Sequence, residues 1–314
     1  MQLQLVQLNK KYNLIVVLGP TATGKTQFAS NLAYRVQGEI ISADSRQIYR
    51  KMNLGTGKDY EDYQVAGTQV PYHLIDIHDP GYKYNVFEYQ MDFLKAFATI
   101  TKQEKFPILC GGTGLYIEAV TKGYKLIAVP VNKNLRRKLE NKSLPELEQI
   151  LAGYKKLHNK TDTDTIKRAI RAIEIEEYYT SNPELTLDYP EINPVFLGIK
   201  IDRETRRERI TKRMYNRLKG GMIEEVKSLI DEGLKPETLI YYGLEYKFIT
   251  LYLTGKLNYD RMVEKLNVAI HQYAKRQMTW FRKMEREGVQ IHWIDGLWTM
   301  EEKVKKTISL IKSK

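Results

Sequence analysis

The most constraining feature of this sequence is a phosphate-binding loop that directly follows an apolar run. The loop comprises Gly19, Pro20, Thr21, Ala22, Thr23, Gly24, Lys25 and Thr26, and the apolar run before it is Leu14–Leu18. The pattern G-x-x-x-x-G-K-[ST] curls its backbone around phosphate oxygens, and its lysine and hydroxyl serve the terminal phosphates and a bound metal. Residues 27–33 continue as an amphipathic helix, whose N-terminal amides favour anions. The segment predicts a diphosphate or triphosphate site.

Apolar runs alternate with helical patterns along the chain, which is typical of a doubly wound α/β fold with a parallel sheet. The predicted strands are Leu14–Leu18, Glu39–Ser42, His73–Ile77, Phe106–Cys110 and Val195–Ile201. Such sheets bind ligands beyond the carboxyl ends of their strands. Polar clusters follow three of the predicted strands, at residues 19–26, 44–49 and 111–116. We expect these clusters to converge on one cleft.

The middle of the chain differs from this pattern. It carries three charged helical segments, Asn132–Asn141, Leu144–His158 and Thr163–Tyr179, and then a stretch that contains proline. We interpret residues 125–193 as a helical insertion into a core formed by residues 1–124 and 194–314. Within that core we expect residues 203–286 to form a helical C-terminal part.

Cysteine usage and hydropathy exclude several classes of protein. Cys110 is the only cysteine, so a disulfide framework and a cysteine-based metal site are excluded. No apolar run has the length of a membrane span, and residues 1–11 lack the basic start and long apolar centre of a signal peptide. We expect a globular cytoplasmic protein that acts without a membrane.

The charge of the chain points to a polyanionic partner. The formal net charge is +12, and residues 200–219 hold nine basic side chains against three acidic ones. A second basic segment is His271–Arg286, and in the helix predicted there Ile270, Ala274, Met278 and Phe281 fall on one apolar face. Its basic residues lie off that face, where they either contact phosphates or are simply solvated.

Five segments together resemble the tRNA dimethylallyltransferase family, also called tRNA isopentenyltransferases or IPP transferases. They are Gly-Pro-Thr-Ala-Thr-Gly-Lys-Thr at 19–26, Ser-Ala-Asp-Ser-Arg-Gln-Ile-Tyr at 42–49, His-Leu-Ile-Asp at 73–76, Gly-Gly-Thr-Gly-Leu-Tyr at 111–116 and Ala-Lys-Arg-Gln-Met-Thr-Trp-Phe-Arg at 274–282. The resemblance spans nearly the whole chain, with the motifs in family order. It implies a P-loop nucleoside-triphosphate-hydrolase-like α/β core.

The resemblance also implies a reaction. Members of the family transfer the dimethylallyl group from dimethylallyl diphosphate to N6 of adenosine 37 in tRNAs that read codons beginning with U, and they release diphosphate. The phosphate loop at 19–26 would then hold a diphosphate leaving group, with Mg²⁺ at Thr26 and a clamping arginine at Arg213. Arg209 and Arg217 lie one helical turn to either side of Arg213. We expect the enzyme to act as a monomer.

Further site residues follow from matching the family motifs. Asp44 matches the catalytic aspartate that accepts the proton of the adenine amine, although a helix N-cap is the structural alternative for it. Thr21 matches a residue at the reacting centre. The residues that match contacts to the tRNA anticodon stem-loop are Asp44, Ser45, Arg46, Gln47, Thr113, Lys167, Arg168, Arg171, Lys275, Arg276 and Gln277.

The sequence departs from the family pattern at three places, and three other functions compete. Glu245 stands where the family usually has glycine, Ile270-His271 replaces Thr-Arg, and the insertion is shortened ahead of Asn159. We expect all three changes to affect RNA-facing parts.

The competing functions are prenylation of a free adenine nucleotide, phosphorylation of a small molecule with ATP, and RNA binding without catalysis. The charge disfavours the first, and the intact Lys25 and Asp44 disfavour the last.

Overall fold

The computed structural model describes residues 11–155, 163–184 and 188–312, and the chain divides into two compact units. The first unit comprises Met1–Tyr124 and Glu191–Lys314, and the second comprises Lys125–Pro190. The last residues of the expected helix Leu144–His158 lie outside the described part of the chain. Within the described part, no helix is long and apolar enough to cross a membrane.

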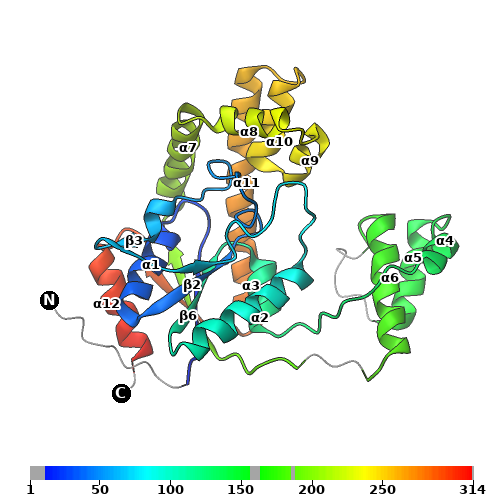
Figure 1. The fold of residues 1–314 in the computed structure, drawn as a ribbon, viewed down its shortest axis with the longest axis horizontal. Coiled ribbons are helices and arrows are strands. Elements are labelled where there is room, and N and C mark those ends of the chain that lie inside the picture. Colours follow the sequence, from blue (N-terminus) through cyan, green and yellow to red (C-terminus); the bar gives the residue numbers. More distant parts are fainter. Residues whose placement is uncertain (1–10, 156–162, 185–187, 313–314) are drawn as a thin grey trace. The chain divides into compact units, whose positions relative to one another are not determined.

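A six-stranded parallel sheet forms the centre of the first unit (Figure 1). Its order is β5-β2-β6-β1-β7-β8. The strands are β1 (Leu14–Leu18), β2 (Gly38–Ala43), β5 (Tyr72–His73), β6 (Phe106–Gly111), β7 (Pro194–Lys200) and β8 (Ile291–Asp295). Because all these strands run in one direction, the loops after β1, β2 and β6 leave the sheet at the same edge. The predicted parallel sheet is therefore confirmed.

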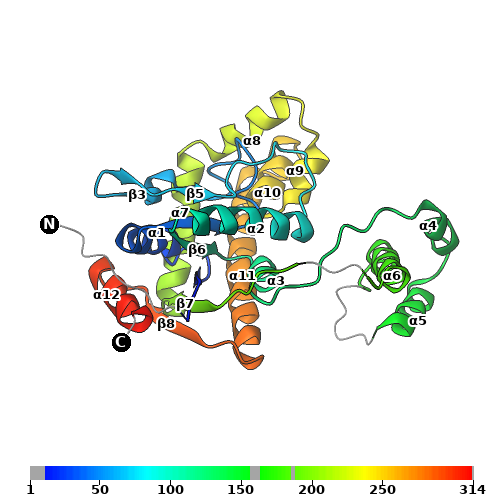
Figure 2. The same ribbon diagram turned by 60° about the horizontal axis from the view of Figure 1, so that its bottom comes forward.

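The two faces of the sheet bury alternate residues of β1, as a pleated strand requires. Ile15 and Val17 pack in an apolar cluster with α1 (Lys25–Val36) and α12 (Met300–Ile311). Leu14, Val16 and Leu18 pack in a second cluster on the other face. That face is covered by α2 (Val86–Lys102), α3 (Gly114–Thr121) and α11 (Tyr259–Arg286), as Figures 1 and 2 show.

Two strand predictions need correction. The predicted strand His73–Ile77 is shorter, because only Tyr72 and His73 pair with β2. Leu74 and Asp76 have φ values of 60° and 56°, which take the chain out of extended geometry. The strand β8 was not predicted at all. It lies at the edge of the sheet, where His292 and Trp293 are only partly buried, so its apolar pattern is weak.

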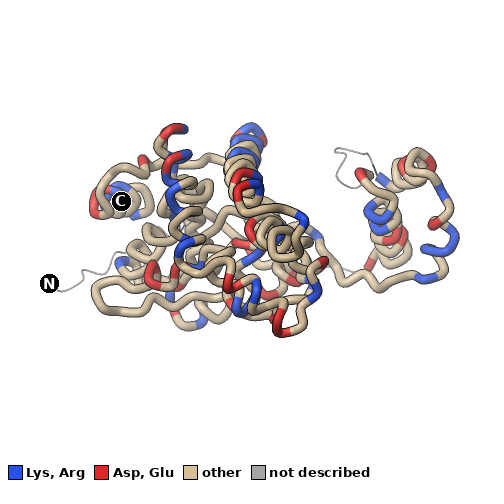
Figure 3. The backbone as a smooth tube through the Cα atoms, turned by 90° about the horizontal axis from the view of Figure 1, so that it is seen from above, with Lys and Arg blue, Asp and Glu red and all other residues tan. Residues whose placement is uncertain are grey.

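The C-terminal half of the first unit is a group of helices around α11. It contains α7 (Arg203–Lys219), α8 (Met222–Asp231), α9 (Pro236–Tyr242) and α10 (Leu244–Leu253). Apolar side chains of α7 and α11, including Ile210 and Phe281, belong to the same cluster as the sheet. Basic and acidic residues are interspersed along these helices (Figure 3).

A smaller structure, η1 with β3 and β4, lies between β2 and β5 in the sequence. The 3₁₀ helix η1 spans Tyr60–Tyr63, and the strands β3 (Gln64–Val65) and β4 (Thr68–Gln69) form a two-stranded antiparallel hairpin. The segment that leads into η1, residues 53–59, contributes to the site described below.

The described residues of the second unit form the helices α4 (Lys133–Leu139), α5 (Leu144–Tyr154) and α6 (Ile166–Ser181). Their apolar residues, among them Leu147 and Ile173, form a small cluster of their own. Glu174 is almost fully buried there and is paired with Arg136 at 2.7 Å. Although burial opposes ionisation, the hydrogen bonds from Arg136 and Arg171 hold the pKa of Glu174 down, at about 2.

Candidate active site

The loop after β1 adopts the conformation of an anion cradle. Helix α1 begins at Lys25, and Gly24 before it has a φ of 79°, in the left-handed region that glycine adopts without strain. The hydroxyl of Thr23 donates to the carbonyl of Pro20 at 2.9 Å and closes the loop from inside. The first amides of α1 are therefore free of side-chain caps and face the space beyond the strand.

A cavity of about 300 Å³ lies at this edge of the sheet. Its lining comes from the phosphate loop, the turn after β2, the segment around η1, the end of β6 and helix α7, namely Thr21, Ala22, Gly24, Lys25, Thr26, Asp44, Gln47, Thr56, Gly57, Asp59, Asp62, Tyr63, Cys110, Gly111, Arg209 and Arg213. All three polar clusters thus contribute to one cleft, as predicted.

Three loop residues do not take the position expected of them. Gly19, Pro20 and Thr23 lie behind the cavity and do not line it, and Thr23 is only 1% exposed. A Cβ atom at Gly19 would come within 2.7 Å of the carbonyl oxygen of Ile199 on the neighbouring strand. Gly19 is needed for this close packing, and Thr23 is needed to brace the loop.

Burial and the neighbouring charges act in opposite directions on the ammonium of Lys25. Burial lowers the pKa of the Lys25 ammonium, while the Cys110 thiol and Asp44 act in the opposite direction and Arg213 adds to the lowering. The thiol of Cys110 donates to the carbonyl of Lys25 at 3.8 Å, and burial raises its pKa to about 12. Cys110 is therefore a packed thiol at the floor of the site rather than a nucleophile.

Two arginines of α7 share one carboxylate at the wall of the cavity. Arg213 donates to Asp59 at 2.7 Å, and Arg217 donates to both oxygens of Asp59 at 2.9 and 3.2 Å. Although burial opposes ionisation, Arg213 and Arg217 hold the pKa of Asp59 below its usual range. Burial raises the pKa of the neighbouring Asp62, and the charge of Asp59 adds to this. Neither aspartate is predictable from the sequence, because single loop carboxylates carry no spacing signal.

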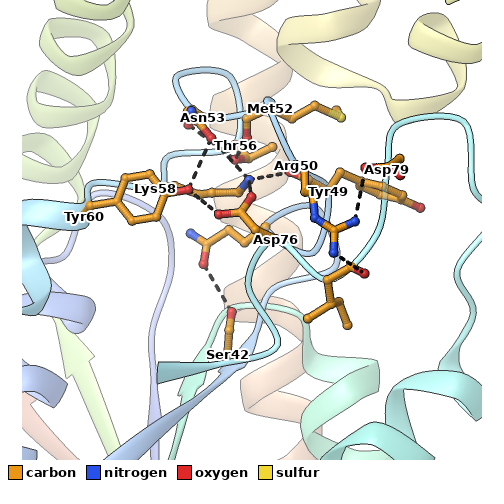
Figure 4. Close-up of polar contacts among 12 residues, drawn as sticks. Ser42, Tyr49, Arg50, Met52, Asn53, Thr56, Lys58, Tyr60, Asp76 and Asp79 are labelled. Atoms are coloured by element: carbon orange, nitrogen blue, oxygen red, sulfur yellow. Dashed lines mark hydrogen bonds and ion pairs between the residues drawn. The ribbon is translucent and has the colours of Figure 1, made fainter. Parts of the chain in front are cut away.

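A buried lysine fixes the segment that carries Asp59 (Figure 4). The ammonium of Lys58, whose side chain is fully buried, donates to the carbonyl of Tyr49 and to Asp76, and Tyr60 also donates to Asp76. Asp76 lies three residues after the end of β5 and has a φ of 56°, in the left-handed region. Sequence analysis also missed Lys58.

The turn after β2 presents Asp44 to the cavity. The four residues after Asp44 form a turn rather than a helix, so the N-cap alternative is wrong. One carboxylate oxygen of Asp44 accepts from the amide of Arg46 at 3.0 Å, which is an Asx-turn. The hydroxyl of Thr113 accepts from the amide of Ser45 at 3.1 Å and ties this turn to the end of β6. Gln47 lines the cavity and donates to the carbonyl of Gly57 at 3.3 Å.

Gln277 has a different position from the one expected for a tRNA contact. It is 5% exposed, its carbonyl accepts from the amide of Thr21 at 2.9 Å, and its amide donates to the carbonyl of Gly112 at 3.0 Å. Both ends of the side chain are therefore used inside the protein. Gln277 fastens the phosphate loop to the turn after β6, and this corrects the sequence-based prediction.

The other predicted RNA contacts divide into exposed and engaged residues. Lys275 and Arg276 are exposed on α11, and Lys167 is exposed on α6. Arg168 is paired with Asp164, one helical turn earlier. Arg171 is paired with Glu174 and donates to the carbonyl of Val129 at 2.9 Å, so much of its hydrogen-bonding capacity is used within the second unit.

Glu245 does not lie where the sequence analysis expected it. It lines a small cavity with Thr21, Ala22, Arg213 and Arg217, next to the phosphate loop rather than on an RNA-facing surface. Burial raises the pKa of Glu245 to about 7, although the charges of Arg217 and Arg213 oppose the rise. His271, the second departure, lies 3.2 Å from the hydroxyl of Thr211 on α7.

Comparison with known proteins gives two family matches. The model described as IPP transferase matches residues 47–284, and the model described as isopentenyl transferase matches residues 12–76. A tRNA dimethylallyltransferase of Bacteroides fragilis is 62% identical over 93% of this chain and 96% of its own length. One of Parabacteroides distasonis is 61% identical over 96% of this chain and 98% of its own length.

Solved structures give the same likeness at the level of the fold. The tRNA isopentenylpyrophosphate transferase of Bacillus halodurans superposes with a TM-score of 0.70 at 30% identity, covering 96% of this chain and 95% of that one. A eukaryotic dimethylallyltransferase, described in crystallographic snapshots of its action on tRNA, superposes with a TM-score of 0.71 at 22% identity. The match covers 91% of this chain and 74% of that one.

Proposed function

This chain belongs to the IPP transferase family and is a tRNA dimethylallyltransferase by its relatives, and from that premise we propose how its own residues carry out the transfer. The proposed donor is dimethylallyl diphosphate, and the proposed acceptor is N6 of adenosine 37 in tRNAs that read codons beginning with U. One observation supports this most: Lys25, Arg213 and Asp44 line the same cavity. An anion cradle and a carboxylate in one cleft suit a reaction that releases diphosphate and a proton.

The diphosphate is the proposed leaving group. The bond from C1 of the allyl group to the diphosphate oxygen breaks, and its electron pair leaves with the oxygen. Charge therefore gathers on the diphosphate in the transition state, where preorganised donors stabilise it. We assign this role to Lys25, Arg213 and the amides at the start of α1, with Thr21 beside the reacting carbon. Arg209 also lines the cavity and adds positive charge.

Asp44 is the proposed proton acceptor. The lone pair of N6 forms the new bond to C1, and the amine becomes strongly acidic as it is alkylated. Its proton can then pass to the Asp44 carboxylate late in the reaction. The Asx-turn with Arg46 and the link from Ser45 to Thr113 hold this carboxylate in place before the adenine arrives.

The side chains present fit a magnesium ion. Thr26 and Asp62 line the cavity, and a hydroxyl and a carboxylate are hard oxygen donors that suit Mg²⁺ together with phosphate oxygens. The carboxylate of Asp59 is already paired with Arg213 and Arg217. Among the described residues, no group of three or more His, Cys, Asp or Glu side chains is arranged to hold a metal. We therefore propose that Thr26 and the substrate's own phosphates hold Mg²⁺, which would neutralise charge on the leaving group.

The target base lies inside an anticodon loop, so it must leave the stack to reach Asp44. We propose that Ser45, Arg46 and Gln47 contact the RNA beside the cavity and that Lys275 and Arg276 contact its phosphates. Lys167, Arg168 and the second unit are proposed to grip the stem-loop. We also propose that the enzyme acts as a cytoplasmic monomer.

The test is a product analysis. The protein is incubated with Mg²⁺, dimethylallyl diphosphate and unmodified tRNA, and the nucleosides are identified by mass spectrometry. We expect N6-prenylated adenosine at position 37. A product formed from free AMP but not from tRNA would instead assign the chain to nucleotide prenylation, and ATP turnover without RNA would point to a kinase.

A further inference from the structure

An exposed aromatic ring lies beside the guanidinium of Arg46. Tyr241, at the end of α9, is 61% exposed, the highest value among the large hydrophobic side chains of the described residues. Helix α9 lies beside the loops that join β2 to α2 (Figures 1 and 2). The guanidinium of Arg46, two residues after Asp44, lies 6.0 Å from the centre of the Tyr241 ring.

The neighbouring ring makes this arrangement rigid. Tyr242 is buried, its hydroxyl accepts from the amide of Gly81 at 2.5 Å, and its ring lies 4.7 Å from that of Tyr49. Arg46 lies 5.5 Å from the ring of Tyr242 as well, so both tyrosines position its guanidinium. The backbone of Arg46 is fixed in turn by its hydrogen bond to Asp44.

The exposed side of Tyr241 is suited to a flat ligand. The rings of Tyr241 and Tyr242 are 6.1 Å apart and inclined by 60°, so Tyr242 does not stack on Tyr241. Aromatic rings and planar guanidinium groups are the surfaces on which proteins stack unpaired bases of RNA. The adjacent guanidinium of Arg46 and the net charge of +12 favour an anionic partner, such as RNA, over a partner protein whose surface has few acidic residues.

We propose that Arg46 and Tyr241 form a stacking shelf for one unpaired base of the anticodon loop, next to the adenosine that enters the cavity. This inference rests on the proposed function, because it takes tRNA as the partner. The shelf supports the loop after the target base has been extruded, when the bases beside it have lost a stacking neighbour. Because every base has a flat face, the shelf contributes affinity more than sequence selectivity.

The test compares Tyr241→Leu with Tyr241→Phe in the full-length protein. Tyr241→Leu should weaken binding of an anticodon stem-loop by about 5- to 100-fold, the effect of one lost base stack, and raise KM for tRNA. The kcat at saturating tRNA and the KM for dimethylallyl diphosphate should not change. Tyr241→Phe should bind like the wild type. Tyr259→Leu is the matched control, because Tyr259 is 44% exposed and lies edge-on to Tyr252.

A fluorescent base locates the contact. We expect 2-aminopurine beside the target adenosine to be quenched on binding to the wild type and not to Tyr241→Leu. Equal RNA affinity of Tyr241→Leu and wild type would overturn the shelf, and so would an equal loss in Tyr241→Phe. A change in the oligomeric mass of Tyr241→Leu would make the ring a contact between copies and also overturn it. Absence of prenylated tRNA with wild-type enzyme would contradict the proposed function instead, whatever the variants bind.

Discussion

The guanidinium of Arg213 donates to the carboxylate of Asp59 at 2.7 Å, within the lining of the cavity that contains Lys25. Arg213 is the arginine proposed to clamp the diphosphate, and an internal anion is paired with it. Asp59 also neutralises Arg217, whose side chain is only 13% exposed. The protein thus keeps two arginines ordered at the cost of a negative charge close to the leaving group.

Neutralising Asp59 should strengthen the binding of diphosphate. In Asp59→Asn the amide oxygen can still accept from the arginines, but their charge is no longer offset. We expect inorganic diphosphate to inhibit this variant about three- to tenfold more strongly, as product-inhibition kinetics would measure. The control is Asp79→Asn, which removes an exposed carboxylate that pairs with Arg50. Weaker inhibition in Asp59→Asn would mean that Asp59 chiefly positions the clamp.

Removing the loop lysine should affect the diphosphate substrate and not the RNA. Lys25→Ala deletes the ammonium at the floor of the cavity, so transition-state charge loses a preorganised partner. We expect kcat/KM for dimethylallyl diphosphate to fall by about 100- to 1,000-fold, with the Kd for tRNA nearly unchanged. Steady-state kinetics and RNA anisotropy measure the two values. An unchanged kcat/KM would contradict the assignment of the loop.

Gln277 should behave as a structural residue. Gln277→Ala leaves the amide of Thr21 and the carbonyl of Gly112 without their partner, and each unsatisfied buried group costs about 1–3 kcal/mol. We expect a clear fall in Tm and a weaker affinity for the allyl diphosphate. The exposed Gln272 on the same helix gives the control, Gln272→Ala. A variant with normal Tm that loses only tRNA affinity would restore Gln277 to the RNA interface.

The stability of the protein should depend on pH through Glu245. Burial raises its folded pKa to about 7, above the ordinary value of 4.5, so between these values the folded state binds more protons than the unfolded state. The contribution of Glu245 to the free energy of unfolding is therefore fully present below about pH 4.5 and is lost as the pH rises through 7. The loss is at most about 3 kcal/mol.

The variant Glu245→Gln removes this titration. We expect its Tm to exceed that of the wild type by more at pH 8 than at pH 5.5, as thermal melts at the two values would record. If the Tm difference between variant and wild type is the same at both pH values, the carboxylate of Glu245 is ionised at both, stabilised by Arg213 and Arg217.

The core of the fold was predictable because its signals are local. Leu14–Leu18 is a continuous apolar run before a glycine-rich turn, and the glycine at position 24 supplies the positive φ that the cradle needs. The convergence of three loops followed from one rule about parallel strands. By contrast β8 is an edge strand with partly polar residues, and β5 ends at His73 because Leu74, directly after it, has a φ of 60°.

Part of the cavity lining was predictable from the family resemblance. Lys25, Asp44 and Arg213 were predicted to act together, and they line one cavity. Asp59 meets Arg213 across 154 positions of sequence, and Gln277 meets Thr21 across 256. Such contacts exist only after the chain has folded, and nothing in local composition separates a buried glutamine from one that faces RNA.

The most direct test of the account is the single-turnover rate of Asp44→Asn with saturating tRNA and dimethylallyl diphosphate. Asparagine keeps the acceptor oxygen of the turn but cannot take the amine proton. We expect the rate of N6-prenyladenosine formation to fall by at least about 100-fold, with the Kd for tRNA changed by less than about threefold. A variant that forms the product at nearly the wild-type rate would contradict the claim that this cavity, with Asp44 as its base, performs the transfer.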